Sequence, residues 1–129
     1  MKAISDTHIL VVDDNPDINS LIKMILEKEG FKVSVALDGA SAITMTQSEK
    51  PDMVLLDVMM PNISGLDVLE KIRSNDNAAI NSIPVVMITA KSSVEDVDKA
   101  VELGASGYII KPFRANVLAE KVYSYLDVD

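Results

Sequence analysis

The chain has 129 residues, 48% of them hydrophobic and 25% charged, which suits one domain over residues 1–129 with a core at about residues 8–126. The formal net charge of -8 argues against direct binding of nucleic acid and favours a protein partner or a bound cation. The absence of cysteine excludes disulfides and thiolate sites and suits a cytoplasmic location, and no apolar run is long enough for membrane insertion.

The first predicted strand and helix are marked by their ends. The apolar run from Ile9 to Val12 has the length of a strand and stops at Asp13-Asp14. Asn15 is a suitable cap for a helix that ends at Gly30. The apolar positions of this helix recur at intervals of three and four residues: Ile18, Leu21, Ile22, Ile25 and Leu26. His8, which precedes the strand, is expected to lie in solvent.

The next segments lead to the central strand. Residues 31–35 alternate apolar and polar side chains, which indicates a strand nearer the sheet edge. The turn at Asp38-Gly39 precedes a weakly patterned helix, and Lys50-Pro51-Asp52 interrupts the chain after it. The uninterrupted apolar run from Met53 to Leu56 then leads directly into Asp57. Such a run predicts a strand that is buried on both faces of a parallel sheet.

The second half of the chain continues the alternation. Its predicted elements are a helix capped by Ser64, a polar loop at 74–82 with one helical turn, a buried strand at 84–88, a helix from Ser93 to Gly104, a strand at 107–110 and a final helix. Val94, Val97 and Val101 share one face of the fourth helix. In the last helix four residues are expected to face inward: Val117, Leu118, Val122 and Tyr125.

The order of these elements predicts an α/β fold. Strands alternate with helices five times, without an internal linker or a short repeat. This pattern is typical of a doubly wound, five-stranded parallel sheet with helices on both faces and right-handed crossovers. The carboxyl ends of all strands then lie at one edge of the sheet, where open α/β folds bind their ligands.

Chemically active residues follow four of the predicted strands: Asp13-Asp14, Asp57, Thr89 and Lys111. Three carboxylates at one edge repel one another unless cations intervene. Hard oxygen ligands with room for water suit Mg²⁺, and a divalent cation together with Lys111 would balance the three negative charges. A metal ion, an amine and a hydroxyl around one Asp suit the formation of an aspartyl phosphate, because phosphoryl transfer depends on positioning and on cations.

These residues resemble the receiver domain of two-component response regulators. The motifs are Val-Val-Asp13-Asp14, Leu-Leu-Asp57-Val-Met-Met-Pro61 followed by Gly65, Ile-Thr89-Ala90-Lys, and Tyr108-Ile-Ile-Lys111-Pro112-Phe113. Each motif alone is weak, but four in order at strand ends are specific. The resemblance runs from about Ile9 to Leu126 and implies a flavodoxin-like fold of the chemotaxis-receiver type with strand order 2-1-3-4-5. It also implies a phosphorylation-gated switch in a phosphorelay.

The resemblance assigns the acidic residues. Asp57 would be the phosphoacceptor. Mg²⁺ would be bound directly by Asp14 and Asp57 and by the main-chain carbonyl of Met59, and Asp13 would bind it mainly through water.

Other positions would hold the phosphoryl group and transmit its presence. Thr89 and Lys111 would bind the phosphoryl oxygens, and Ala90 is small enough to leave room for them. The peptide bond between Lys111 and Pro112 would be cis. Thr89 and Tyr108 would form the switch, with Tyr108 rotating into the space that the Thr89 hydroxyl vacates.

The resemblance also implies the partners. The phosphoryl donor would be a sensor histidine kinase or a histidine phosphotransfer protein, and a downstream protein target or an output domain would bind the face built by helix 93–104, strand 107–110 and the last helix. The protein would catalyse only its own Mg²⁺-dependent phosphorylation and slow dephosphorylation. The chain ends at Asp129 soon after the last helix, which fits a stand-alone receiver or one domain of a longer protein. Residues 127–129 are expected to fray.

Three alternatives use the same residues. A phosphatase of the haloacid dehalogenase type needs a second Asp two residues after its nucleophile, where this chain has Met59. A flavodoxin-like binder needs a phosphate-cradling loop after the first strand, which the sequence lacks. A degenerate receiver that acts as a constitutive binding module would normally have lost one of the acidic pair, Asp57 or Lys111. Taken singly, a strand-end Asp is often only a helix cap or turn residue, and Tyr108 could simply pack on its strand.

Overall fold

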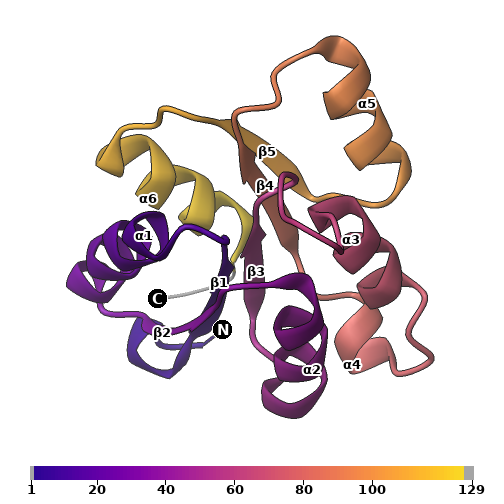
Figure 1. The fold of residues 1–129 in the computed structure, drawn as a ribbon. Coiled ribbons are helices and arrows are strands. Elements are labelled where there is room, and N and C mark those ends of the chain that lie inside the picture. Colours follow the sequence, from indigo (N-terminus) through magenta and orange to yellow (C-terminus); the bar gives the residue numbers. More distant parts are fainter. Residues whose placement is uncertain (1, 127–129) are drawn as a thin grey trace.

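The computed structural model describes residues 2–126, and its strands form one parallel sheet (Figure 1). The strands are β1 (His8–Val12), β2 (Lys32–Ala36), β3 (Met53–Leu56), β4 (Val85–Thr89) and β5 (Gly107–Ile110). They are ordered β2-β1-β3-β4-β5 and every neighbouring pair is parallel. The predicted α/β fold and its strand order are therefore confirmed. The segment that was expected to fray, residues 127–129, lies outside the described residues.

Helices cover both faces of the sheet (Figure 1). They are α1 (Pro16–Glu29), α2 (Gly39–Glu49), α3 (Gly65–Arg73), α4 (Ala78–Asn81), α5 (Val94–Glu102) and α6 (Ala115–Tyr125), after a short 3-10 helix at Ile4–Asp6. α1 and α6 cover one face, while α2, α3 and α5 lie on the other. α4 is the helical turn expected within the polar loop at 74–82. No helix within residues 2–126 has both the length and the apolar character needed to cross a bilayer.

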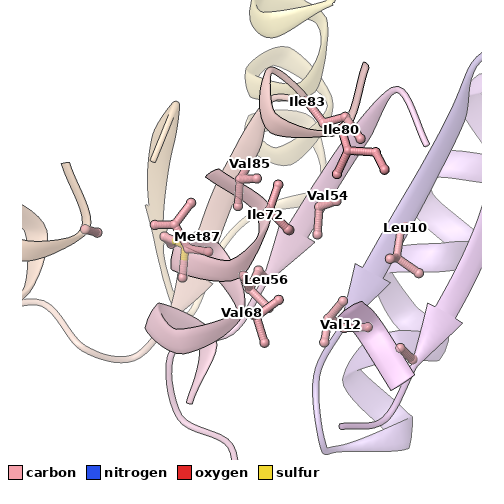
Figure 2. Packing of buried hydrophobic residues seen from close by; sticks show 14 residues of the cluster. Leu10, Val12, Val54, Leu56, Val68, Ile72, Ile80, Ile83, Val85 and Met87 are labelled. Carbon is pink, nitrogen blue, oxygen red and sulfur yellow. The ribbon is translucent and has the colours of Figure 1, made fainter. Parts of the chain in front are cut away.

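The core consists of two apolar layers, because successive residues of a strand point to opposite faces of the sheet. One layer lies between the sheet and the helices α2, α3 and α5. Figure 2 labels its members from the strands and from α3: Leu10, Val12, Val54, Leu56, Val85, Met87, Val68 and Ile72. The other layer joins the alternate strand residues to α1 and α6: Ile9, Val11, Met53, Leu55, Val86, Ile88, Ile22, Leu26, Leu118 and Val122. The central strand is thus buried on both faces, as its unbroken apolar run predicts.

Side-chain caps fix the starts of α1 and α3, the helices that follow β1 and β3. The Asn15 side chain accepts a hydrogen bond from the amide of Asp17 at the start of α1, as predicted. Ser64 forms a capping box with Asp67 at the start of α3. These caps hold the chain where it leaves the carboxyl edge of the sheet.

The inward face of α1 contains four of its five predicted apolar residues, Ile18, Ile22, Ile25 and Leu26, but it includes Asn19 and leaves Leu21 outside. Asn19 is 2% exposed, while Leu21 is 42% exposed. The fully buried positions of this face are Asn19, Ile22 and Leu26. Apolar spacing favoured Leu21, but the buried strand ends beneath α1 offer carbonyl groups that need a donor, and the Asn19 amide supplies it.

Two further expectations were wrong. Val117 was expected to face inward but is 38% exposed, since Leu118 and Val122 alone supply the fully buried positions of α6. His8 was expected to lie in solvent but is half-buried, and its Nε2 lies 2.6 Å from the hydroxyl of Ser34 on the neighbouring strand.

Arg73 joins three segments at the end of α3. Its Nε donates to the carbonyl of Gly104 at 2.9 Å, and its Nη1 donates to the carbonyls of Asn81 and Ile83 at 3.0 and 2.7 Å. Burial lowers the pKa of the guanidinium from its ordinary value. One side chain therefore holds the polar loop after α3 and the turn after α5 against the sheet.

We predict that Arg73→Met lowers the free energy of unfolding by about 2 kcal/mol, because three carbonyl groups lose a charged donor and the Met chain keeps only the packing. Urea denaturation measures the change. Lys71→Met on the exposed side of the same helix is the control and should change stability by less than about 0.5 kcal/mol. Equal losses in the two variants would contradict the role assigned to Arg73.

Candidate functional site

Four strand ends bring the predicted residues to one edge of the sheet. The amide of Asp57 donates to the carbonyl of Val12 at 3.0 Å, which extends the β1–β3 pairing by one residue. The amide of Lys111 donates to the carbonyl of Thr89 at 2.9 Å and extends the β4–β5 pairing in the same way. The edge is thus ordered by main-chain hydrogen bonds before any side chain is considered.

Three carboxylates meet at this edge. One oxygen atom from each of Asp13, Asp14 and Asp57 lies within 4.8 Å of the other two. Asp13 is 3% exposed and Asp57 is 6% exposed, while Asp14 is exposed. Buried like charges at this separation repel strongly, so the arrangement requires positive charge nearby.

Lys111 supplies one positive charge. Its Nζ donates to Oδ2 of Asp13 at 2.6 Å and to Oδ2 of Asp57 at 3.0 Å. Burial of the amine acts to lower its pKa, but the hydrogen bonds and charges of Asp13 and Asp57 outweigh burial, so the pKa of Lys111 is raised above its ordinary value. The amine therefore stays protonated between the two buried carboxylates.

The loop after β3 fixes the orientation of Asp57. The main-chain amide of Met59 donates to Oδ1 of Asp57 at 3.0 Å, so the two oxygens of this carboxylate have different partners. The amide of Gly65 donates to the carbonyl of Val58, and a Cβ atom at residue 65 would overlap the carbonyl oxygen of Asp57. Only glycine allows the start of α3 to pack this closely on the main chain of Asp57.

Thr89 and Tyr108 meet at the main chain of Lys91. Thr89 is fully buried, and its Oγ1 accepts a hydrogen bond from the amide of Lys91 at 3.3 Å. The hydroxyl of Tyr108 donates to the carbonyl of Lys91 at 2.7 Å. Burial, followed by the charges of Asp96 and Asp57, raises the pKa of Tyr108. Ala90, which lies between Thr89 and Lys91 in the sequence, is exposed. The peptide bond between Lys111 and Pro112 is cis.

A shallow cavity of about 590 Å³ lies beside the carboxylates. Its lining includes Asp14, Met59, Lys91 and Lys99. The side chain of Met59 is 52% exposed. The site is therefore open to solvent on the side where Asp14 lies.

The donor set fits a divalent cation. Carboxylate oxygens are hard ligands, and Asp14 is exposed, so water can complete the coordination shell that Mg²⁺ prefers. Lys111 balances only part of the negative charge of the three carboxylates. The unbalanced charge and the open side both suit a bound metal ion.

Two residues at the site were missed or undervalued from sequence. The amide of Asn19 donates to the carbonyls of Asp13 and Ala36, and the apolar spacing of α1 gave no sign of it. The main chain of Lys91 joins Thr89 to Tyr108, a role that no side-chain motif in the sequence indicates. The sequence signal available for Asn19 was a polar residue beside the apolar positions of α1, near the start of the helix that follows β1.

Stability should fall at high pH through Lys111. Because the pKa of Lys111 is raised in the folded protein, its contribution is complete below the unfolded pKa of about 10.4 and is lost as pH rises through the folded pKa. Urea unfolding between about pH 8 and pH 11.5 should give a steeper alkaline decline for the wild type than for Lys111→Met. Parallel curves would show that Lys111 contributes nothing of this kind.

Comparisons with known proteins agree with this geometry. The family model described as "Response regulator receiver domain" matches residues 9–123. The DNA-binding response regulator MtrA of Mycolicibacterium smegmatis is 39% identical over 118 residues, which is 92% of this chain and 50% of MtrA. The probable transcriptional regulatory protein TcrX of Mycobacterium tuberculosis is 44% identical over 105 residues, which is 81% of this chain and 43% of TcrX. The chain thus spans about half the length of these relatives.

Solved structures give the same result. The chemotaxis protein CheY4 of Vibrio cholerae superposes with a TM-score of 0.87 at 28% identity, covering 93% of this chain and 98% of CheY4. The receiver domain of the Francisella response regulator 1452 superposes with a TM-score of 0.85 at 28% identity, covering 93% of this chain and 96% of that domain. The chain therefore belongs to the response regulator receiver domain family of two-component systems.

Proposed function

We propose that Asp57 accepts a phosphoryl group from a phosphohistidine of a sensor histidine kinase or a histidine phosphotransfer protein. The observation that carries this proposal is the Lys111 amine held between the buried carboxylates of Asp13 and Asp57, with Asp14 exposed beside them. In this arrangement a nucleophilic carboxylate, an amine and an open acidic site lie within reach of one incoming group. Phosphoryl transfer needs this kind of positioning and charge compensation, with little other covalent work from the protein.

The transfer conserves atoms and charge. A carboxylate oxygen of Asp57 forms a bond to phosphorus while the bond from phosphorus to the donor imidazole nitrogen breaks, and that nitrogen keeps the electron pair. The amide of Met59 holds Oδ1 of Asp57 in place, and Lys111 and Thr89 would bind oxygens of the incoming group. Mg²⁺, held by Asp14, Asp57, the carbonyl of Met59 and, through water, Asp13, would supply positive charge to the transferred oxygens.

The proposed switch connects the site to the face built by α5, β5 and α6. Thr89 and Tyr108 both bond to the main chain of Lys91, so a phosphoryl group that attracts the Thr89 hydroxyl would alter the surroundings of Tyr108. Four apolar side chains on this face are 38–76% exposed: Val94, Val101, Ile110 and Val117. We propose that this face binds a downstream protein target or an output domain.

The scope of the proposal follows from the chain's own residues. We propose that residues 1–129 act as one receiver unit, in the cytoplasm, on its own Asp57 and on no separate metabolite. Met59 occupies the position where a phosphatase would need its acid, so dephosphorylation should be slow. MtrA is named as DNA-binding, but it is about twice as long as this chain, and the net charge of -8 makes DNA a poor direct ligand here.

Incubation with acetyl phosphate tests the proposal. The intact mass should rise by one phosphoryl group in the presence of Mg²⁺ and should not change without Mg²⁺ or in Asp57→Asn. Asp98→Asn on the exposed side of α5 is the control and should be modified like the wild type. An adduct that persists in Asp57→Asn would place the acceptor elsewhere, and rapid turnover of a generic phosphatase substrate would favour an enzyme.

Removal of one carboxylate should separate stability from metal binding. In metal-free protein, Asp14→Asn should raise the free energy of unfolding by about 0.5–1 kcal/mol, because it relieves like-charge repulsion at the cluster. Mg²⁺ at ten times its Kd should then stabilise the wild type by about 1.4 kcal/mol and the variant by much less. Thermal denaturation with and without Mg²⁺ measures both effects.

Asp76→Asn is the matched control, because Asp76 is exposed in the loop after α3 and lies outside the acidic cluster. It should leave both the metal-free stability and the Mg²⁺ response close to those of the wild type. A metal-free Asp14→Asn protein that is less stable than the wild type would refute the repulsion argument.

A further inference from the structure

Asn19 lies beneath the site. It is not among the residues assigned to metal binding, phosphoryl binding or the switch. It stands in the second turn of α1 and is 2% exposed. Its Nδ2 donates to the main-chain carbonyl of Asp13 at 2.9 Å and to that of Ala36 at 3.1 Å. A single amide group thus joins α1 to the carboxyl ends of β1 and β2.

These contacts determine the orientation of the Asn19 amide. Both partners of Nδ2 are carbonyl oxygens, so a rotated amide would place Oδ1 against two acceptors. With Nδ2 facing these two carbonyls, Oδ1 is buried and has no hydrogen-bond partner among residues 2–126. An apolar side chain such as Leu would avoid this cost, so packing alone does not explain an amide at this position.

The side-chain amide of Asn19 acts on the main-chain carbonyl of Asp13. The amide of Asp13 donates to the carbonyl of Ala36 at 3.3 Å, and Oδ1 of Asp13 accepts from the amide of Asn15 at 2.9 Å. These two bonds hold the main-chain amide and the carboxylate of Asp13. The side chain of Asn19 holds the main-chain carbonyl of the same residue. The three together fix the residue whose Oδ2 faces Lys111.

We propose that Asn19 is a positioning residue of the phosphoryl-transfer site, which holds the main chain of Asp13 and thereby sets the affinity of the acidic cluster for Mg²⁺. The inference rests on the proposed function for its metal. Removal of groups that orient metal ligands commonly lowers affinity ten- to a hundredfold, and Asn19 contacts the main chain rather than the carboxylate, so we expect a loss of about tenfold.

The test compares Asn19→Leu, which keeps the size of the side chain and removes the donor, with Thr46→Val. Thr46 is also a buried polar residue, 1% exposed, and its hydroxyl bonds only to the carbonyl of Ala42 within α2, on the other face of the sheet. Any effect of lowered global stability should therefore be present in both variants. If Asn19→Leu does not fold, Asn19→Ala replaces it, because it removes the same donor with less steric demand.

Two readouts are needed. Amide hydrogen exchange in metal-free protein, measured by NMR, should become faster at Asp13 and Asn15 in Asn19→Leu than in Thr46→Val. Isothermal titration of Mg²⁺ should give a Kd about tenfold higher in Asn19→Leu than in the wild type, and an unchanged Kd in Thr46→Val.

Exchange at Asp13 and Asn15 that matches the Thr46→Val control would overturn the positioning role. Faster exchange with an unchanged Mg²⁺ affinity would overturn the link between Asn19 and the metal. A wild-type protein that binds no Mg²⁺ would defeat the proposed function and with it the affinity link, while the exchange rates would still decide whether Asn19 positions Asp13.

Discussion

The bridge from Lys111 to Asp13 and Asp57 is the interaction on which the site depends. Two nearly buried carboxylates so close together would otherwise repel each other strongly. The amine of Lys111 lies 2.6 Å from Oδ2 of Asp13 and 3.0 Å from Oδ2 of Asp57, and its positive charge offsets this repulsion. Lys111 comes from the far end of the sequence, so the bridge forms only when β5 has joined the sheet. Assembly of the site therefore requires the complete sheet.

The rest of the structure holds the three partners of this bridge at fixed positions. The order of the strands places β1 and β3 side by side, which brings Asp13 next to Asp57, and β4 connects β3 to the strand that carries Lys111. Gly65 lets α3 begin directly against the main chain of Asp57. Arg73 anchors the opposite end of α3 to the turns beside β4 and β5. Each of these features acts on the main chain, and together they hold the strand ends and the start of α3 that form the site.

Sequence reasoning succeeded where one rule decides the outcome. Parallel strands end at one edge, so the acids at residues 13, 14 and 57, Thr89 and Lys111 had to lie at the same edge if the strands were assigned correctly. It failed where partners distant in sequence decide the outcome. The buried position of Asn19 depends on the carbonyl of Ala36, and the position of Arg73 depends on Gly104. Periodicity within one helix contains no information about such partners, which is why Leu21 and Val117 were placed inside although they are exposed.

A crystal structure of the protein with Mg²⁺ and beryllofluoride would test the proposed phosphoacceptor site most directly. Beryllium should be bonded to a carboxylate oxygen of Asp57, with the metal ion on the side of Asp13 and Asp14. The amine of Lys111 should lie within hydrogen-bond distance of a fluorine. The Thr89 hydroxyl should contact a second fluorine. A metal ion bound away from the acidic cluster, or an Asp57 that forms no adduct while Mg²⁺ is bound, would contradict the proposed phosphoacceptor site.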